Sequence, residues 1–226
     1  NHQIAPPATG VGLYTGGGAL PCSLAAVAVP SLGALGPNCR FRGHFWMNET
    51  SEGPAGQLVG DFVEVDLEGL LARHFAHALH APAHLRIDES RFRKGRLEEA
   101  AGMLVAGPGA IGRPLLDTAV VRLNMLNQLE PNRAAPLVSF EQLAASFRID
   151  SAGLVLRGAC PPKDSGAILI DHSGVLLGEP IRQPVTVVAL LQTLGSAVDP
   201  QVPATLPTGW LISRLPVRQV DGSREE

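Results

Sequence analysis

The chain has 226 residues, of which 45% are hydrophobic and 17% charged, and its formal net charge is -3 at pH 7. This length and apolar content allow a sizeable core in one large domain or two small ones. The low charge excludes the basic field that nucleic acid or anionic lipid headgroups would select. The 25 glycines and 19 prolines are spread along the chain, which favours many turns and therefore many strands.

Residues 1–37 are rich in Gly, Pro and Ala, and we interpret them as a loose lead-in. Within them only 20–29 has enough apolar content for a strand. Residues 39–47 alternate apolar and polar side chains, which is the period-two pattern of a half-buried strand. After a Gly-Pro turn, 57–67 is the expected hairpin partner of that strand.

Residues 68–80 predict a short amphipathic helix that ends before Pro82, because their large apolar residues recur at helical spacing: Leu70, Leu71, Phe75 and Leu79. The same order then recurs. Residues 84–94 are followed by a turn at Gly95 and by a predicted strand over 96–106. Residues 114–129 then predict a helix with proline in its first turn.

The stretch 138–180 consists of short apolar runs separated by glycine or by Asp/Ser pairs, which is typical of an antiparallel meander with tight turns. Residues 184–194 then predict a helix, with Gly195 placed to cap its end. A last short helix or strand is an option for 206–217, and 218–226 are expected to be disordered.

These elements form three strand–turn–strand–helix units, at 39–80, 84–129 and 139–195, within a single β-rich domain over 38–217. Short segments of the second and third units also correspond in sequence: 85–88 with 147–150, 92–95 with 154–158, and 109–112 with 174–178. Units that each expose an apolar face must stack to bury it. We therefore predict a mainly β fold, an elongated, curved antiparallel sheet of repeated strand–turn–strand units with two or three short helices.

The three cysteines, Cys22, Cys39 and Cys160, include no C-x-x-C pair, which argues against a thiolate zinc site or a thioredoxin-type centre. A Cys22–Cys39 disulfide is an alternative in an oxidising compartment, but we favour buried free thiols. No run of about 20 apolar residues is present to span a bilayer as a helix. The chain begins at Asn1 without a signal peptide, so we interpret it as an excised or processed segment. Whether a membrane anchor precedes it is left open.

A frame of apolar residues and glycines runs through the third unit: Phe140, Leu143, Phe147, Ile149, Gly153, Leu154, Leu156 and Gly158, then Gly166, Ile168, Ile170, Asp171 and Gly174, and finally the apolar helix up to Leu194. With the preceding unit it covers 84–195, about half of the chain. This pattern resembles the C-terminal region of AsmA-like proteins, relatives of TamB and of the eukaryotic bridge-like lipid carriers.

The resemblance implies a non-enzymatic module of the bacterial cell envelope, on the periplasmic side of the inner membrane, that guides or supports phospholipid transport between membranes. The implied partners are phospholipid and an inner-membrane anchor or other envelope proteins, with no cofactor and no catalytic residues. The chain is short compared with full-length members, and its cysteines and histidines are no part of the pattern. An alternative is a structural or protein-interaction β domain without a lipid groove.

A second alternative is a metal-dependent enzyme, because His74, His77 and His80 fall three residues apart on the predicted helix and His84 follows. Imidazoles at that spacing can share a helix face and hold zinc or copper with a position open for water. The sequence has no H-E-x-x-H motif to supply a general base, so a solvated helix face or a partly buried turn is the favoured interpretation. The alternating carboxylates Asp61, Glu64, Asp66 and Glu68 are likewise expected to form the solvent side of a strand.

Overall fold

The computed structural model describes residues 10–26, 30–72, 75, 77–129, 135–162, 165–195 and 213–216. In chain order its elements are β1 (Gly10–Tyr14), β2 (Leu20–Pro21), α1 (Cys22–Ala25), the 3-10 helix η1 (Pro30–Leu35), β3 (Arg40–Thr50), β4 (Gly53–Asp66), α2 (Leu67–Ala72), β5 (Leu79–His80), β6 (Pro82–Arg93), β7 (Arg96–Ala106), β8 (Gly109–Gly112), α3 (Arg113–Arg122), β9 (Met125–Asn127), β10 (Leu137–Phe140), β11 (Gln142–Asp150), β12 (Gly153–Gly158), β13 (Ala167–Asp171), β14 (Gly174–Pro180) and α4 (Val187–Leu194).

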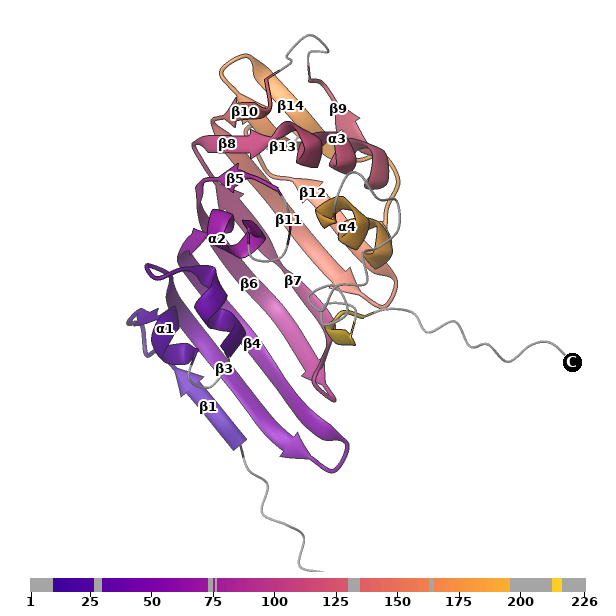
Figure 1. Ribbon diagram of the computed structural model, residues 1–226. Coiled ribbons are helices and arrows are strands. Elements are labelled where there is room, and N and C mark those ends of the chain that lie inside the picture. The colour runs from indigo at the N-terminus through magenta and orange to yellow at the C-terminus, as the bar shows by residue number, and fades with distance from the viewer. Residues whose placement is uncertain are drawn as a thin grey trace, which may run out of the picture.

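The main sheet has 11 strands, and its path runs β1-β3-β4-β6-β7-β11-β13-β14-β9. In addition β2 pairs with β3, and β12 pairs with β11. The strands of the described residues pair antiparallel throughout, and the sheet forms a long surface that does not close on itself (Figure 1). The predicted mainly β, antiparallel architecture with few short helices is confirmed, and the three predicted helices begin in or near α2, α3 and α4.

A second layer lies against one face of the main sheet, which we call the helix-bearing face. It contains a small sheet in the order β10-β8-β5, together with the helices (Figure 1). One large buried cluster joins the layers, in which Phe41 and Phe62 of the main sheet meet Leu71 of α2, Leu116 of α3 and Ile111 of β8.

The strand register decides which side chains reach this core. Phe41 pairs with Phe62, Phe62 with Leu85, and Leu85 with Leu104. Residues directly opposite each other in a ladder project to the same side of a sheet. This row therefore lies on the helix-bearing face, and the residues between its members project to the opposite face, which we call the polar face.

Two-residue turns join the hairpins where the sequence predicts them. Lys94 and Gly95, between β6 and β7, have φ values of 54° and 70°, as in a type I′ turn. The β11–β12 and β13–β14 turns begin with Asp150 and Asp171, whose Oδ1 atoms accept hydrogen bonds of 2.7 Å from the second following N–H. The predicted meander over 138–180 is confirmed at both of its Asp turns.

Two helices are shorter than predicted, because strand pairing takes over their last residues. The helix expected over 68–80 ends at residue 72, and Leu79–His80 pairs with β8 as β5. The helix expected over 114–129 ends at residue 122. Asn124 has a left-handed φ of 54°, and the chain then adds β9 to the edge of β14. The helix predictions are therefore wrong at the described residues 75 and 77–80, and at 123–129.

The N-terminal stretch expected as a lead-in contributes to the sheet, since β1 pairs with β3 over its whole length. The strand expected over 20–29 is wrong at 22–26, where α1 begins, and 27–29 lie outside the described residues. Of the expected element over 206–217 the structure describes only 213–216, and the tail 218–226 lies outside the described residues.

The free-thiol prediction holds for one cysteine and is wrong for two. Cys22 and Cys39 form a disulfide with their Cα atoms 5.3 Å apart. Cys160 is free and buried, and its Sγ donates to the carbonyl oxygen of Ile168 at 3.2 Å. Burial raises the pKa of the Cys160 thiol, because the thiolate would lose its hydration.

Strands followed by a helix recur three times along the chain, but the segments matched by sequence occupy different places. Residues 85–88 lie within β6, whereas 147–150 end β11; residues 109–112 are β8 of the small sheet, whereas 174–178 begin β14 of the main sheet. These correspondences are wrong as structural equivalences, because any strand beside a turn shares such apolar and glycine patterns.

Strand β6 carries a β-bulge. Gly60 pairs with Ile87 and Gly56 with Phe92, so the segment 56–60 of β4 opposes the longer segment 87–92 of β6. Ser90, only 2% exposed, bridges this interruption. Its Oγ accepts a hydrogen bond from the N–H of Leu58 at 3.0 Å and donates one to the carbonyl of Leu58 at 2.7 Å.

Replacing Ser90 with alanine is expected to lower the free energy of unfolding by about 1–3 kcal/mol, because both backbone groups of Leu58 lose their partner. Urea unfolding followed by circular dichroism measures the change. Ser146→Ala, on the polar face of β11, is the matched control, with an expected change below about 0.5 kcal/mol. Equal changes in the two variants would contradict the bridging role of Ser90.

Candidate functional site

Six apolar side chains continue the helix-bearing face along β1, β3, β4 and β6. Residues two apart on a strand share a face, so Phe45 and Met47 project to the same side as Phe41. Leu13 and Leu58 both pair with Phe45, while Val11 pairs with Met47. Gly56 lies between Met47 and Phe92. We call this row the apolar strip: Val11, Leu13, Phe45, Met47, Leu58 and Phe92.

The second layer covers the apolar strip only in part. Val11 is 46% exposed, and Phe45, Met47 and Phe92 are half-buried. None of these three half-buried residues packs against the buried clusters formed by the described residues. In Figure 1 none of the labelled helices stands in front of the ends of β3 and β4 near their connecting turn. The strip is therefore an apolar surface that a further apolar group can reach.

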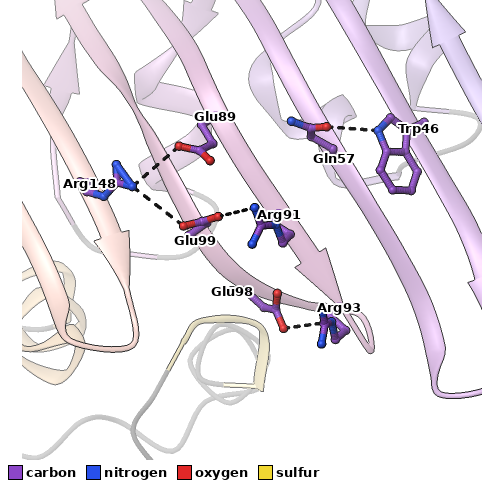
Figure 2. A network of polar contacts seen from close by, with 8 residues as sticks. All are labelled: Trp46, Gln57, Glu89, Arg91, Arg93, Glu98, Glu99 and Arg148. Atoms are coloured by element: carbon purple, nitrogen blue, oxygen red, sulfur yellow. Dashed lines mark hydrogen bonds and ion pairs between the residues drawn. The ribbon is translucent and has the colours of Figure 1, made fainter.

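The polar face at the same level carries charged pairs instead (Figure 2). The Arg148 guanidinium lies 3.8 Å from Glu89 and 3.9 Å from Glu99, and Arg91 lies 3.1 Å from Glu99. Arg93 pairs with Glu98 at 3.3 Å. Each cation is thus neutralised by a carboxylate across the strands, so this face favours water. Over β6, β7 and β11 the polar face is therefore charged, whereas over β1 and β3 it carries the exposed rings of Tyr14 and Trp46.

A small pocket of about 190 Å³ lies where β4 and β6 separate at the bulge, next to these pairs, and it is lined by Trp46, Ala55, Gly56, Gln57, Glu89, Ser90, Arg91, Phe92 and Arg93. Trp46 donates from its indole nitrogen to Gln57 at 3.3 Å (Figure 2). The other polar side chains of the lining bond to residues outside it: Ser90 to the backbone of Leu58, and Glu89, Arg91 and Arg93 to charged partners on the strands.

The histidines do not come together in the described part of the chain. His77 is buried, with Nε2 at 2.8 Å from the carbonyl oxygen of Gly195, to which it donates. His80 Nδ1 lies 2.7 Å from Glu68, and His84 Nε2 lies 2.9 Å from Asp61. His74 lies outside the described residues. The shared helix face expected for them is wrong, because His80 is in β5, and the described residues contain no group of three or more potential ligands placed to hold a metal.

A pocket of about 540 Å³ lies where β4 ends beside α2 and β5, lined by Asn38, Glu64, Val65, Asp66, Glu68, His80, Ala81 and Pro82. Its three carboxylate residues are exposed, as the strand pattern predicts. Asp66 accepts a hydrogen bond from the N–H of Gly69 at 2.9 Å, and Glu68 pairs with His80. Two of these carboxylates therefore support local structure.

Two further findings bear on function. In the portion of the chain that the structure describes, no helix combines the length and apolar character needed to cross a membrane. Comparisons of the chain with protein-family models, with curated proteins and with solved structures gave no match.

Proposed function

We propose that the chain is a non-enzymatic module of the bacterial cell envelope that guides or supports phospholipid transport, in the manner of the AsmA-like proteins it resembles. The observation that carries the proposal is the apolar strip, which continues the sheet face beyond the second layer. Its partners would be phospholipid and an inner-membrane anchor or other envelope proteins, on the periplasmic side of the inner membrane.

The physical basis is the contrast between the two faces of the sheet. An acyl chain gains about 0.8 kcal/mol for each methylene removed from water. Phe45 and Met47 of β3 and Phe92 of β6 offer such contacts on the two sides of β4, while the headgroup stays in water at the strand ends. The ion pairs around Glu99 leave the polar face of β6, β7 and β11 without a comparable apolar surface. Binding of this kind needs no specific polar site and no catalytic group.

A structural or protein-interaction domain is the second candidate function. It is favoured by the second layer, whose residues fill the helix-bearing face over much of the main sheet in one continuous core. A metal-dependent enzyme has the least support, because His77, His80 and His84 bond to separate partners.

Native mass spectrometry of the gently purified chain tests the proposal, together with binding to vesicles of phosphatidylethanolamine and phosphatidylglycerol. We expect co-purified phospholipid in the wild type. Met47→Arg should reduce the bound lipid about tenfold or more, because a guanidinium placed against acyl chains loses hydration without a partner.

The matched control is Trp46→Arg, the neighbouring residue whose side chain projects to the polar face and is 40% exposed. It should leave lipid binding unchanged. Wild-type protein that carries no lipid, or an equal loss in both variants, would count against lipid transport and favour the interaction domain.

A further inference from the structure

Strand β1 ends the main sheet with unpaired backbone groups. Among the described residues only β3 pairs with it. The backbone N–H of Thr15 donates to the carbonyl of Gly43 at 3.1 Å. Hydrogen-bonded pairs alternate with non-hydrogen-bonded pairs along an antiparallel ladder. Leu13 and Val11 therefore bond to β3, while Gly12 and its alternate neighbours direct their N–H and C=O groups away from the sheet.

Another strand edge of the same sheet is covered. The side chain of Gln183 bonds to both backbone groups of Leu156 in β12, at 2.9 and 2.6 Å. Leu154 and Val185 exchange two backbone hydrogen bonds of 2.8 and 2.7 Å. The unpaired N–H and C=O groups of an open edge can bond to another strand, and proteins commonly protect such edges with charge, proline or a covering segment. Strand β1 has the sequence Gly-Val-Gly-Leu-Tyr and so carries neither charge nor proline.

We propose that β1 pairs antiparallel with β1 of a second copy of this chain, centred on Gly12. In this register the two Gly12 residues oppose each other, and Gly10 opposes Tyr14 of the second copy. These are the residues whose backbone groups face outward, so each pair exchanges two hydrogen bonds. A two-fold axis through Gly12 closes the assembly as a dimer.

The side chains of β1 fit this register on both faces. On the polar face the Tyr14 ring, 79% exposed in the single chain, covers the bare backbone at Gly10 of the second copy. On the helix-bearing face Val11 opposes Leu13 of the second copy. By symmetry the dimer contains two such apolar cross-strand pairs. Because β1 is uncharged, no like charges meet. Strand β1 is thus complementary to itself, and a second copy of this chain is the partner that fits its open edge.

One consequence rests on the proposed function. The pairing would join the apolar strips of the two copies through Val11 and Leu13, giving a lipid a longer continuous surface. The pairing itself depends only on the edge of β1, so it can hold even if the chain binds no lipid.

Sedimentation velocity of the full chain over a concentration series tests the pairing. We expect a reversible dimer, and Gly12→Asp should weaken it about tenfold or more, since two carboxylates would face each other across the axis. A Cβ placed on Gly12 meets no atom within 4 Å in the single chain, so the variant should fold normally. Asn48→Asp, one strand away on the same face, is the matched control and should dimerise like the wild type.

Gly12→Cys gives a second readout. Opposed residues of a hydrogen-bonded pair have Cα atoms about 5.5 Å apart, within disulfide range, so this variant should cross-link to a covalent dimer on mild oxidation. Asn48→Cys should not, because two strands would separate its sulfurs. A monomer at every concentration, unchanged dimerisation of Gly12→Asp, or cross-linking of Gly12→Cys to a different protein would overturn the proposal. A dimer without bound lipid would overturn only the proposed function.

Discussion

Replacing Phe41 with alanine is expected to lower the free energy of unfolding by about 3–5 kcal/mol, the usual cost of deleting a buried aromatic ring. Phe41 is 1% exposed, and its ring centroid lies 4.8 Å from that of Phe62. The ring also covers two glycines. A Cβ placed on Gly43 or Gly60 would lie 2.9 Å from an atom of the Phe41 ring. The variant therefore loses the contacts of the ring and exposes the backbone beneath it.

Denaturant unfolding followed by circular dichroism measures this loss. Phe45→Ala is the matched control, since Phe45 lies on the same strand and face but is half-buried and outside the buried clusters. Its expected cost is about 1 kcal/mol, in proportion to its smaller buried area. Equal losses for Phe41 and Phe45 would mean that the apolar strip is covered as fully as the core.

The strands of the central hairpins could be predicted from the sequence because their pattern is local. Residues 39–47 alternate in polarity, and Lys94-Gly95 supplies the left-handed conformations of a tight turn. Asp150 and Asp171 mark two further turns through hydrogen bonds to residues close in sequence. Each of these features depends on neighbours a few positions away.

The helix ends could not be predicted in this way, because a partner distant in sequence decides them. Leu79–His80 is strand because β8 lies beside it, and β9 forms because β14 offers an edge. Both segments are too short to show a period, so the helical spacing of their apolar residues dominated the prediction. Short strands of this kind build the small sheet, which the sequence did not reveal.

Only part of the candidate site could be predicted from the sequence. The alternation in β3 places Phe45 and Met47 on one face, and the sequence shows that much. Whether that face is covered depends on how far the second layer extends over the sheet, and the pattern of a single strand carries no information about that layer. For the same reason the histidine spacing was misleading, since its chemistry required a helix that stops at Ala72.

Reducing the disulfide between Cys22 and Cys39 is expected to lower the free energy of unfolding by about 3 kcal/mol. The two residues are separated by 17 positions, and a cross-link closing a loop of that size removes this much chain entropy from the unfolded state. Both side chains are fully buried, and the N–H of Cys22 donates to the carbonyl of Cys39 at 2.8 Å. The folded structure therefore holds the sulfurs together even when reduced, and the effect falls on the unfolded chain.

Urea unfolding with and without a thiol reductant measures the difference, and alkylation followed by mass spectrometry reports which cysteines are free. The double variant Cys22→Ala/Cys39→Ala is the control, and reductant should not change its stability. The free thiol of Cys160 remains in that control, so any residual reductant effect would be assigned to it. Wild-type protein whose stability is the same before and after complete reduction would show that the cross-link does not constrain the unfolded chain, and the attachment of α1 to β3 would then depend on packing alone.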